Sequence, residues 1–111
     1  MRLYSRIAHK TLKRSCLKEK DGIATNIYFR DMEWLKSSDV VVAEVTTPSL
    51  GVGYELGIAE KLNKPVLCLY RPKAGKVLSA MIQGNKIFKC QEYNNLSKAK
   101  LYIDIFFNNL L

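Results

Sequence analysis

The sequence predicts an α/β fold in which a parallel sheet is flanked by helices, and three neighbouring segments carry this prediction. Residues 39–45 and 65–70 are two mostly apolar runs, which is typical of parallel strands that are buried on both faces. Residues 53–63 place apolar side chains at helical spacing until Asn63 and Pro65 end the pattern. Two buried strands that flank one helix predict a right-handed β–α–β unit.

The segments before this unit are predicted from the spacing of their apolar residues. Residues 2–14 have the pattern of an amphipathic helix, and residues 15–26 that of a polar connection. Residues 28–36 predict a second helix with Met32 and Leu35 toward the core. The apolar face of the first helix would consist of Leu3, Tyr4, Ile7, Ala8 and Leu12.

The segments after the unit complete a single domain, because 111 residues suffice for one core. We expect a basic loop at 71–76, a short helix at 77–82 and an edge strand at 86–93. Ser97 is predicted to cap a last helix. The side chains of this helix that are predicted to pack inward are Leu101, Ile105, Phe106 and Leu110.

The net charge of +8 is concentrated at the beginning of the chain. Residues 1–20 hold seven basic side chains against the single acidic Glu19, a net charge of +6. Contact with a nucleic acid or another acidic surface is one interpretation of this segment. A solvated helix face is favoured, because no set of aromatic residues for stacking on bases interleaves these charges.

The cysteines and the hydropathy pattern favour an intracellular protein, in the cytoplasm, the nucleus or both. Cys16, Cys68 and Cys90 are odd in number, widely spaced and not arranged as C-x-x-C, so they predict neither a zinc site nor a disulfide framework. No apolar run reaches the ~18–20 residues that a membrane span needs, and no signal peptide is recognised.

The segment DVVVAEVTTPSLGVGYELG, residues 39–57, is the clearest candidate for a functional site. It predicts a strand, a glycine-rich turn and the first turn of a helix, whose free N–H groups and positive dipole end suit a phosphate. Glu55 is expected in that first turn as an ionised carboxylate. A purely structural role is the alternative, because Glu in a first helical turn stabilises the helix dipole without any ligand.

Other chemical motifs receive little support. The G-x-G-x-x-G spacing of dinucleotide-binding turns is absent. The segment AGKVLS at 74–79 lacks the first glycine of a P-loop and the Ser or Thr that should follow Lys76. His9 is the only histidine and has no partner at metal-ligand or triad spacing, so neither a metal site nor a nucleophile–histidine pair is predicted.

Three segments together carry a resemblance to a known family: Asp31-Met-Glu-Trp-Leu, residues 39–57 as quoted, and LCLYRPKAGKVLSAMIQG at 67–84. The chain resembles the 2′-deoxynucleoside 5′-monophosphate N-glycosidases, which are relatives of the nucleoside 2-deoxyribosyltransferases. The likeness is close over roughly residues 30–84 and weaker in RLYSRIAHKTLKR.

The resemblance implies a flavodoxin-like (Rossmann-like) domain over residues 1–111, shortened at its N-terminus. Members of the family begin with a strand and a G-S-I-R-G-G-like loop, and nothing similar precedes Leu3. In a flavodoxin-like strand order the first strand lies beside the strand at 39–45. We therefore expect that strand to have an open edge in this chain.

The resemblance also assigns roles to residues. It implies that Glu55 is the nucleophile at C1′ of the deoxyribose and that Asp31 assists departure of the base. Ser49 and Gly51 match residues that hold the 5′-phosphate. Ser79, with Met81 nearby, matches a serine that reaches the phosphate of the neighbouring subunit, which implies a homodimer. The implied reaction is retaining glycoside hydrolysis without a metal or organic cofactor, and it yields free base and deoxyribose 5-phosphate.

Three alternatives remain open at this point. The first is a nucleotide-binding or dimerisation module of the same fold with weak or no catalysis. The second is a truncated gene product. The third is a basic protein that associates with nucleic acid through residues 2–20.

Overall fold

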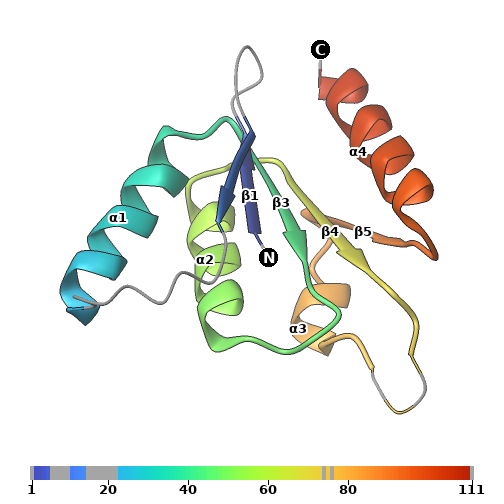
Figure 1. The fold of residues 1–111 in the computed structure, drawn as a ribbon, viewed down its shortest axis with the longest axis horizontal. Helices are drawn as coiled ribbons and strands as arrows, with labels where there is room; N and C mark the ends of the chain where they lie inside the picture. Colours follow the sequence, from blue (N-terminus) through green and yellow to red (C-terminus); the bar gives the residue numbers. More distant parts are fainter. Residues whose placement is uncertain (1, 6–10, 15–22, 74, 76, 111) are drawn as a thin grey trace.

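A computed structural model of the chain describes residues 2–5, 11–14, 23–73, 75 and 77–110. Five strands form one sheet in the order β2-β1-β3-β4-β5 (Figure 1). They are β1 (Arg2–Ser5), β2 (Thr11–Arg14), β3 (Val40–Glu44), β4 (Val66–Tyr70) and β5 (Phe88–Glu92). The last three are parallel, whereas β1 runs antiparallel to both β2 and β3.

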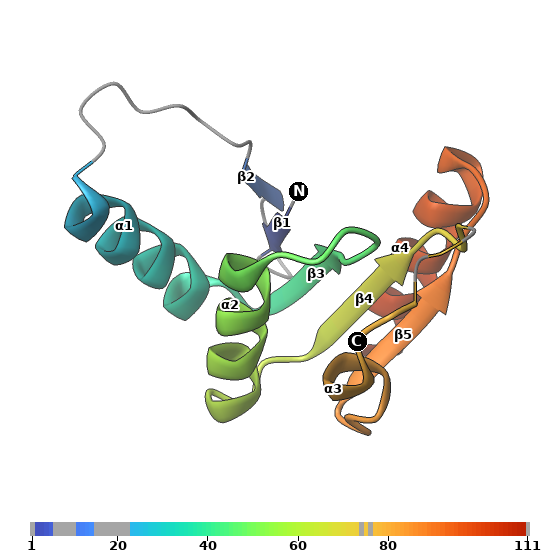
Figure 2. The same ribbon diagram turned by 90° about the horizontal axis from the view of Figure 1, so that it is seen from below.

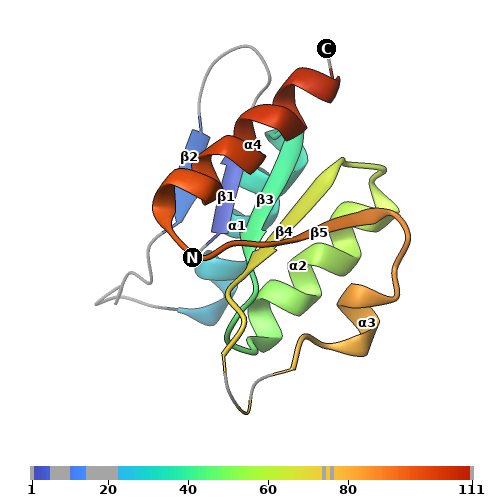
Figure 3. The same ribbon diagram turned by 90° about the vertical axis from the view of Figure 1, so that its right-hand side faces the viewer.

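The helices cover the two faces of this sheet. They are α1 (Ala24–Ser37), α2 (Leu50–Lys61), α3 (Ala80–Gln83) and α4 (Leu96–Leu110). α1, α2 and α3 lie on one face, and α4 lies on the opposite face (Figures 2 and 3). The predicted α/β class is therefore confirmed, with a parallel core of three strands.

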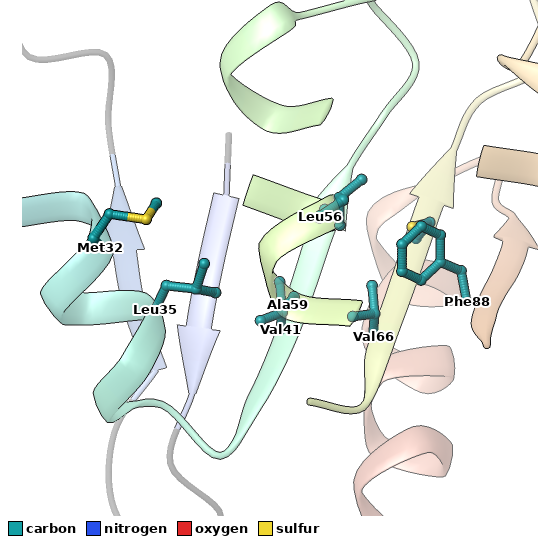
Figure 4. Packing of buried hydrophobic residues seen from close by; sticks show 9 residues of the cluster. Met32, Leu35, Val41, Leu56, Ala59, Val66 and Phe88 are labelled. Atoms are coloured by element: carbon teal, nitrogen blue, oxygen red, sulfur yellow. The ribbon is translucent and has the colours of Figure 1, made fainter. Parts of the chain in front are cut away.

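The core follows from the alternation of side chains along β3 and β4. Val41 and Val66 point to the face of α1 and α2, where they meet Leu35, Leu56 and other apolar side chains (Figure 4). Their neighbours in the strands point to α4 instead. Both faces of these strands are buried, as the apolar runs predict.

The prediction of a helix over residues 2–14 is wrong. β1 and β2 occupy this segment, and Ser5 pairs with Val40 and Arg2 with Ala43 along the edge of β3. The reason is tertiary, because an unpaired edge of a buried strand leaves its N–H and C=O groups without partners. The expected open edge of β3 is therefore also absent: β1 covers it.

The helical segments differ from their predictions mainly at their ends. α1 begins at Ala24, within the expected polar connection, and α2 begins at Leu50, so Gly51 and Gly53 lie inside the helix. α3 spans Ala80–Gln83, so it begins three residues later and ends one residue later than the predicted 77–82. The strand predicted at 86–93 is confirmed as the edge strand β5.

The last helix has a different cap and a different buried face from those predicted. Asn95 Oδ1 accepts the hydrogen bond of Lys98 N at 2.9 Å, so Asn95 and not Ser97 caps α4. Phe106 is buried and Leu110 packs against the core as predicted, but Leu101 and Ile105 are exposed. Ala99, Tyr102 and Ile103 take their places against the sheet. Among the described residues, no helix has the length and apolar character of a membrane span.

Candidate functional site

The loop between β3 and α2 ends in a capped helix N-terminus. Ser49 has an extended backbone and its Oγ accepts the hydrogen bond of Val52 N at 3.3 Å. Such a cap leaves further first-turn N–H groups, including that of Gly51, without helical acceptors. The positive end of the helix dipole adds to them, so this N-terminus suits an anion. The predicted strand–loop–helix arrangement is therefore present.

Glu55 lies deeper in α2 than predicted. Because the helix starts at Leu50, the first turn contains no acidic residue and Glu55 falls in the second turn. Its side chain is 5% exposed, and its Oε2 atom is fully enclosed. A buried carboxylate is energetically costly, so its position indicates a role beyond stabilising the helix dipole.

Asp31 is a second buried carboxylate on the same face of the sheet. It lies in α1, is 6% exposed, and its Oδ1 accepts from Arg30 Nε at 3.4 Å. The Arg30 guanidinium in turn stacks 4.9 Å above the Trp34 ring, which fixes its direction. Among the described residues, Asp31 and Glu55 are the only buried ionisable carboxylates.

An aromatic contact joins the two helices close to these carboxylates. The Tyr28 and Tyr54 rings meet edge to face with their centroids 6.4 Å apart. Tyr28 lies one turn before Asp31, and Tyr54 directly precedes Glu55. A hydrogen bond with Tyr28 raises the pKa of Tyr54 above its ordinary value. Both rings remain about half exposed, so they are accessible to a planar ligand.

A cavity of about 630 Å³ lies at the α2 N-terminus, and Tyr54 is among its lining residues. The β3–α2 loop and the first turns of α2 form one wall, and residues 77–82 form the other. Ser49, Ser79 and Met81 all line it, and Ser79 Oγ also caps α3 by accepting from Met81 N at 3.2 Å. Gly51, Asp31 and Glu55 do not line it. The structure thus brings the two serines together and places both carboxylates outside their cavity.

A polar network at the carboxyl ends of the parallel strands is a feature that the sequence analysis missed. Glu44 ends β3; its Oε1 accepts from Thr46 N at 2.7 Å and its Oε2 from Thr46 Oγ1 at 2.8 Å. The Tyr93 hydroxyl also donates to Oε2, and Arg71 N donates to Thr46 Oγ1 at 2.8 Å. The side chains that follow parallel strands gather at one sheet edge, which is the signal that could have revealed this network.

The neighbours of Tyr93 in this network have opposite effects on its pKa. Burial and the Glu44 carboxylate raise the pKa of Tyr93, and the neighbouring Arg71 acts in the opposite direction. The Arg71 guanidinium lies 5.0 Å from the centre of the Tyr93 ring. The phenol therefore stays protonated at neutral pH and remains a donor to Glu44.

Metal and cysteine chemistry receive no support from the described part of the chain. No group of three His, Cys, Asp or Glu side chains there could hold a metal ion. Cys68 is fully buried, and burial with the nearby Cys90 raises its pKa to about 12. His9, Cys16 and Lys76 lie outside the described residues, as do the side chains of the basic segment 1–20.

Comparison with known proteins gives one family and several close relatives. The sequence model of the family described as nucleoside 2-deoxyribosyltransferase matches residues 6–97. A 5-hydroxymethyl-dUMP N-hydrolase of Danio rerio is 59% identical over 78 residues, which is 68% of this chain and 54% of that protein. Proteins of the same name are 69% identical in Mus musculus and 67% in Homo sapiens, each over 58 residues and 52% of this chain. These 58 residues are 34% and 33% of the two mammalian proteins, so the chain spans about half or less of the relatives it matches.

Proposed function

The chain belongs to the nucleoside 2-deoxyribosyltransferase family, and from this premise we propose that it hydrolyses the N-glycosidic bond of 2′-deoxynucleoside 5′-monophosphates. The products are the free base and deoxyribose 5-phosphate. The names of its relatives, 5-hydroxymethyl-dUMP N-hydrolases, support this class of reaction. The observation that carries the proposal is the buried Glu55 carboxylate in a helix whose N-terminus suits a phosphate.

The proposed chemistry uses the two buried carboxylates in two steps. Glu55 attacks C1′ and forms an ester, while the bond from C1′ to the base breaks and the base takes a proton with the help of Asp31. Water then attacks C1′ and returns a proton through Asp31 to replace the one that the base took; the ester breaks and the Glu55 carboxylate is restored, so configuration is retained. A fixed carboxylate in a buried setting stabilises the positive charge that develops on the sugar.

The 5′-phosphate is proposed to bind at the N-terminus of α2, through the Ser49 hydroxyl and the Gly51 N–H group. We place Ser79 and Met81 at the phosphate site of a second subunit in a homodimer. The exposed apolar side chains around the cavity support such an association, because Leu50 and Met81 are 96% and 82% exposed.

The direct test measures base release by purified protein. Incubation with dGMP or 5-hydroxymethyl-dUMP, followed by chromatography, is expected to show free base, and Glu55→Gln should lower the rate by about a thousandfold or more. Glu60→Gln is the matched control, because Glu60 lies in α2 but is only partly buried. Asp31→Asn has its own control in Glu33→Gln, an exposed carboxylate of α1. Wild-type rates in Glu55→Gln would refute the nucleophile assignment.

The homodimer has a separate test by complementation. Glu55→Ala removes the nucleophile of one subunit, and Ser79→Trp obstructs the site of the other. If Ser79 acts across the interface, mixing these two inactive variants should restore part of the activity, because some heterodimers contain one intact site. No restored activity would instead assign Ser79 to the site of its own chain, whose cavity it lines together with Ser49. A fully active monomer in analytical ultracentrifugation would contradict this arrangement.

A second candidate function is nucleotide binding without catalysis. The observation in its favour is that Asp31 and Glu55 lie outside the cavity lined by Ser49 and Ser79. Titration calorimetry with dGMP separates the two candidates: heat of binding without base release supports the binding module, and base release supports the hydrolase.

A further inference from the structure

We propose that Glu44 is a positioning residue that fixes the loop between β3 and α2 for phosphate binding. This inference rests on the proposed function, since it concerns the same phosphate site. The loop starts at Glu44 and leads through Thr46 to Ser49, where α2 begins. Thr46 and Ser49 belong to the same short loop and line the same cavity, so the conformation of the loop at Thr46 bears on the position of Ser49.

Three donors hold the Glu44 carboxylate, and two of them belong to Thr46. The backbone N–H and the hydroxyl of Thr46 each bond one carboxylate oxygen, at 2.7 and 2.8 Å. The same hydroxyl oxygen accepts from Arg71 N at 2.8 Å. Thr46 is therefore held through both its backbone and its side chain, which leaves the first part of the loop with one conformation.

The hydrogen-bond network connects the loop to the ends of three neighbouring strands. Glu44 ends β3, Arg71 directly follows β4, and Tyr93 directly follows β5. The backbone strengthens this link, because Tyr93 N donates to Tyr70 O at 3.0 Å and Val45 N donates to Leu69 O at 2.8 Å. A loop anchored to rigid strands holds a binding site more precisely than one anchored at a single point.

The charge of Glu44 allows its positioning role to be separated from a direct electrostatic one. A negative charge close to a phosphate loop opposes anion binding by Coulomb repulsion alone. Removal of that charge would therefore tighten nucleotide binding if Glu44 did nothing else. A positioning role predicts the opposite sign, because Gln has a single acceptor oxygen. In one orientation its Nε2 replaces the acceptor of the Thr46 and Tyr93 hydroxyls, and in the other it replaces the acceptor of Thr46 N.

The experiment measures kcat, KM and the dGMP dissociation constant for Glu44→Gln and its control. We expect both KM and the dissociation constant to rise about tenfold, with kcat within about threefold of wild type. Glu92→Gln is the matched control: this exposed carboxylate at the end of β5 accepts from the Tyr70 hydroxyl at 3.1 Å and does not contact Thr46. Unchanged or tighter dGMP binding by Glu44→Gln would overturn the proposal.

A second pair of variants keeps the test valid if Glu44→Gln fails to fold. Thr46→Ser retains the hydroxyl and should bind dGMP like wild type, whereas Thr46→Val should weaken binding to the same degree as Glu44→Gln. Equal affinities of the two Thr46 variants would also overturn the proposal. Absence of base release by wild type would refute only the hydrolase, because the dGMP dissociation constants still decide the role of Glu44; a wild type that does not bind dGMP refutes both.

Discussion

Ser49→Asp separates the role of Ser49 as a helix cap from its role as a phosphate ligand. Asp caps helices about as well as Ser, and its charge stabilises the helix dipole by about 0.3–1 kcal/mol. The carboxylate of Asp can accept the same hydrogen bond from Val52 N that the Ser49 hydroxyl accepts at 3.3 Å, so the cap is kept in this variant. We therefore expect the free energy of unfolding to stay equal or to rise by less than about 1 kcal/mol.

The same change should weaken nucleotide binding, because it places a second negative charge beside the phosphate. Two unit charges about 4 Å apart interact by about 1 kcal/mol in water and about 4 kcal/mol near a protein surface. A phosphate monoester carries a charge of about −1.5 to −2 at neutral pH, so the loss is at least about 1.5 kcal/mol. This corresponds to at least about tenfold weaker binding.

Urea unfolding and titration calorimetry with dGMP measure the two effects on the same samples. Ser49→Ala is the complementary variant: it should lower the free energy of unfolding by about 0.5–1 kcal/mol through loss of the cap. Its effect on dGMP affinity should be smaller than that of Ser49→Asp, because it introduces no repulsive charge. A folded Ser49→Asp protein that binds dGMP as tightly as wild type would place the phosphate elsewhere.

Three further predictions concern the fold. Leu56→Ala should lower the free energy of unfolding by about 2–5 kcal/mol, because Leu56 is 1% exposed in the core. Leu96→Ala, at a side chain that is 77% exposed, should change it by less than about 0.5 kcal/mol; urea unfolding measures both, and equal effects would contradict the packing. Gly57→Ala should raise the free energy of unfolding by about 0.5–1 kcal/mol, because Gly57 lies in the middle of α2 and an added Cβ meets no atom within 4 Å. Thermal unfolding tests this, and a destabilised variant would refute it. Iodoacetamide at pH 8 should leave Cys68 unmodified in the folded protein and modify it in urea, because burial raises the pKa of Cys68 to about 12. Peptide mass spectrometry detects the alkylation, and alkylation of Cys68 in the folded protein would argue against its burial.

The central β–α–β unit could be predicted because its signals are local. A short apolar pattern in the sequence predicts each of β3, α2 and β4, and Asn63 and Pro65 mark the end of the helix. The antiparallel strands β1 and β2 could not be predicted, since the spacing of apolar residues in this part of the sequence also fits a helix. The deciding interaction is the pairing of Arg2 with Ala43, 41 residues later in the sequence, and local spacing contains no information about such pairing.

The sequence predicted which residues belong to the candidate site better than it predicted their positions in the structure. The two glycines before Glu55 suggested a turn, but a helix capped by Ser49 accommodates both of them, which moves Glu55 to the second turn. The Glu44 network was missed because Glu44, Arg71 and Tyr93 are far apart in sequence and meet only when three strands end at one edge. Whether Glu55, Asp31 and Ser79 have the roles that the family resemblance implies stays a prediction.

The different starts of α1 and α2 have a consequence for hydrogen exchange. α2 starts with the Ser49 cap and lies between two central strands in sequence, whereas Ile23 at the start of α1 provides no side-chain cap and is 60% exposed. Amide protons in the first turns of α1 should therefore exchange through local fraying, and those of β3 and β4 only through global opening. Asp31 and Glu55 thus belong to helices whose N-termini differ in local stability, and fraying at the start of α1 leaves α2, β3 and β4 folded.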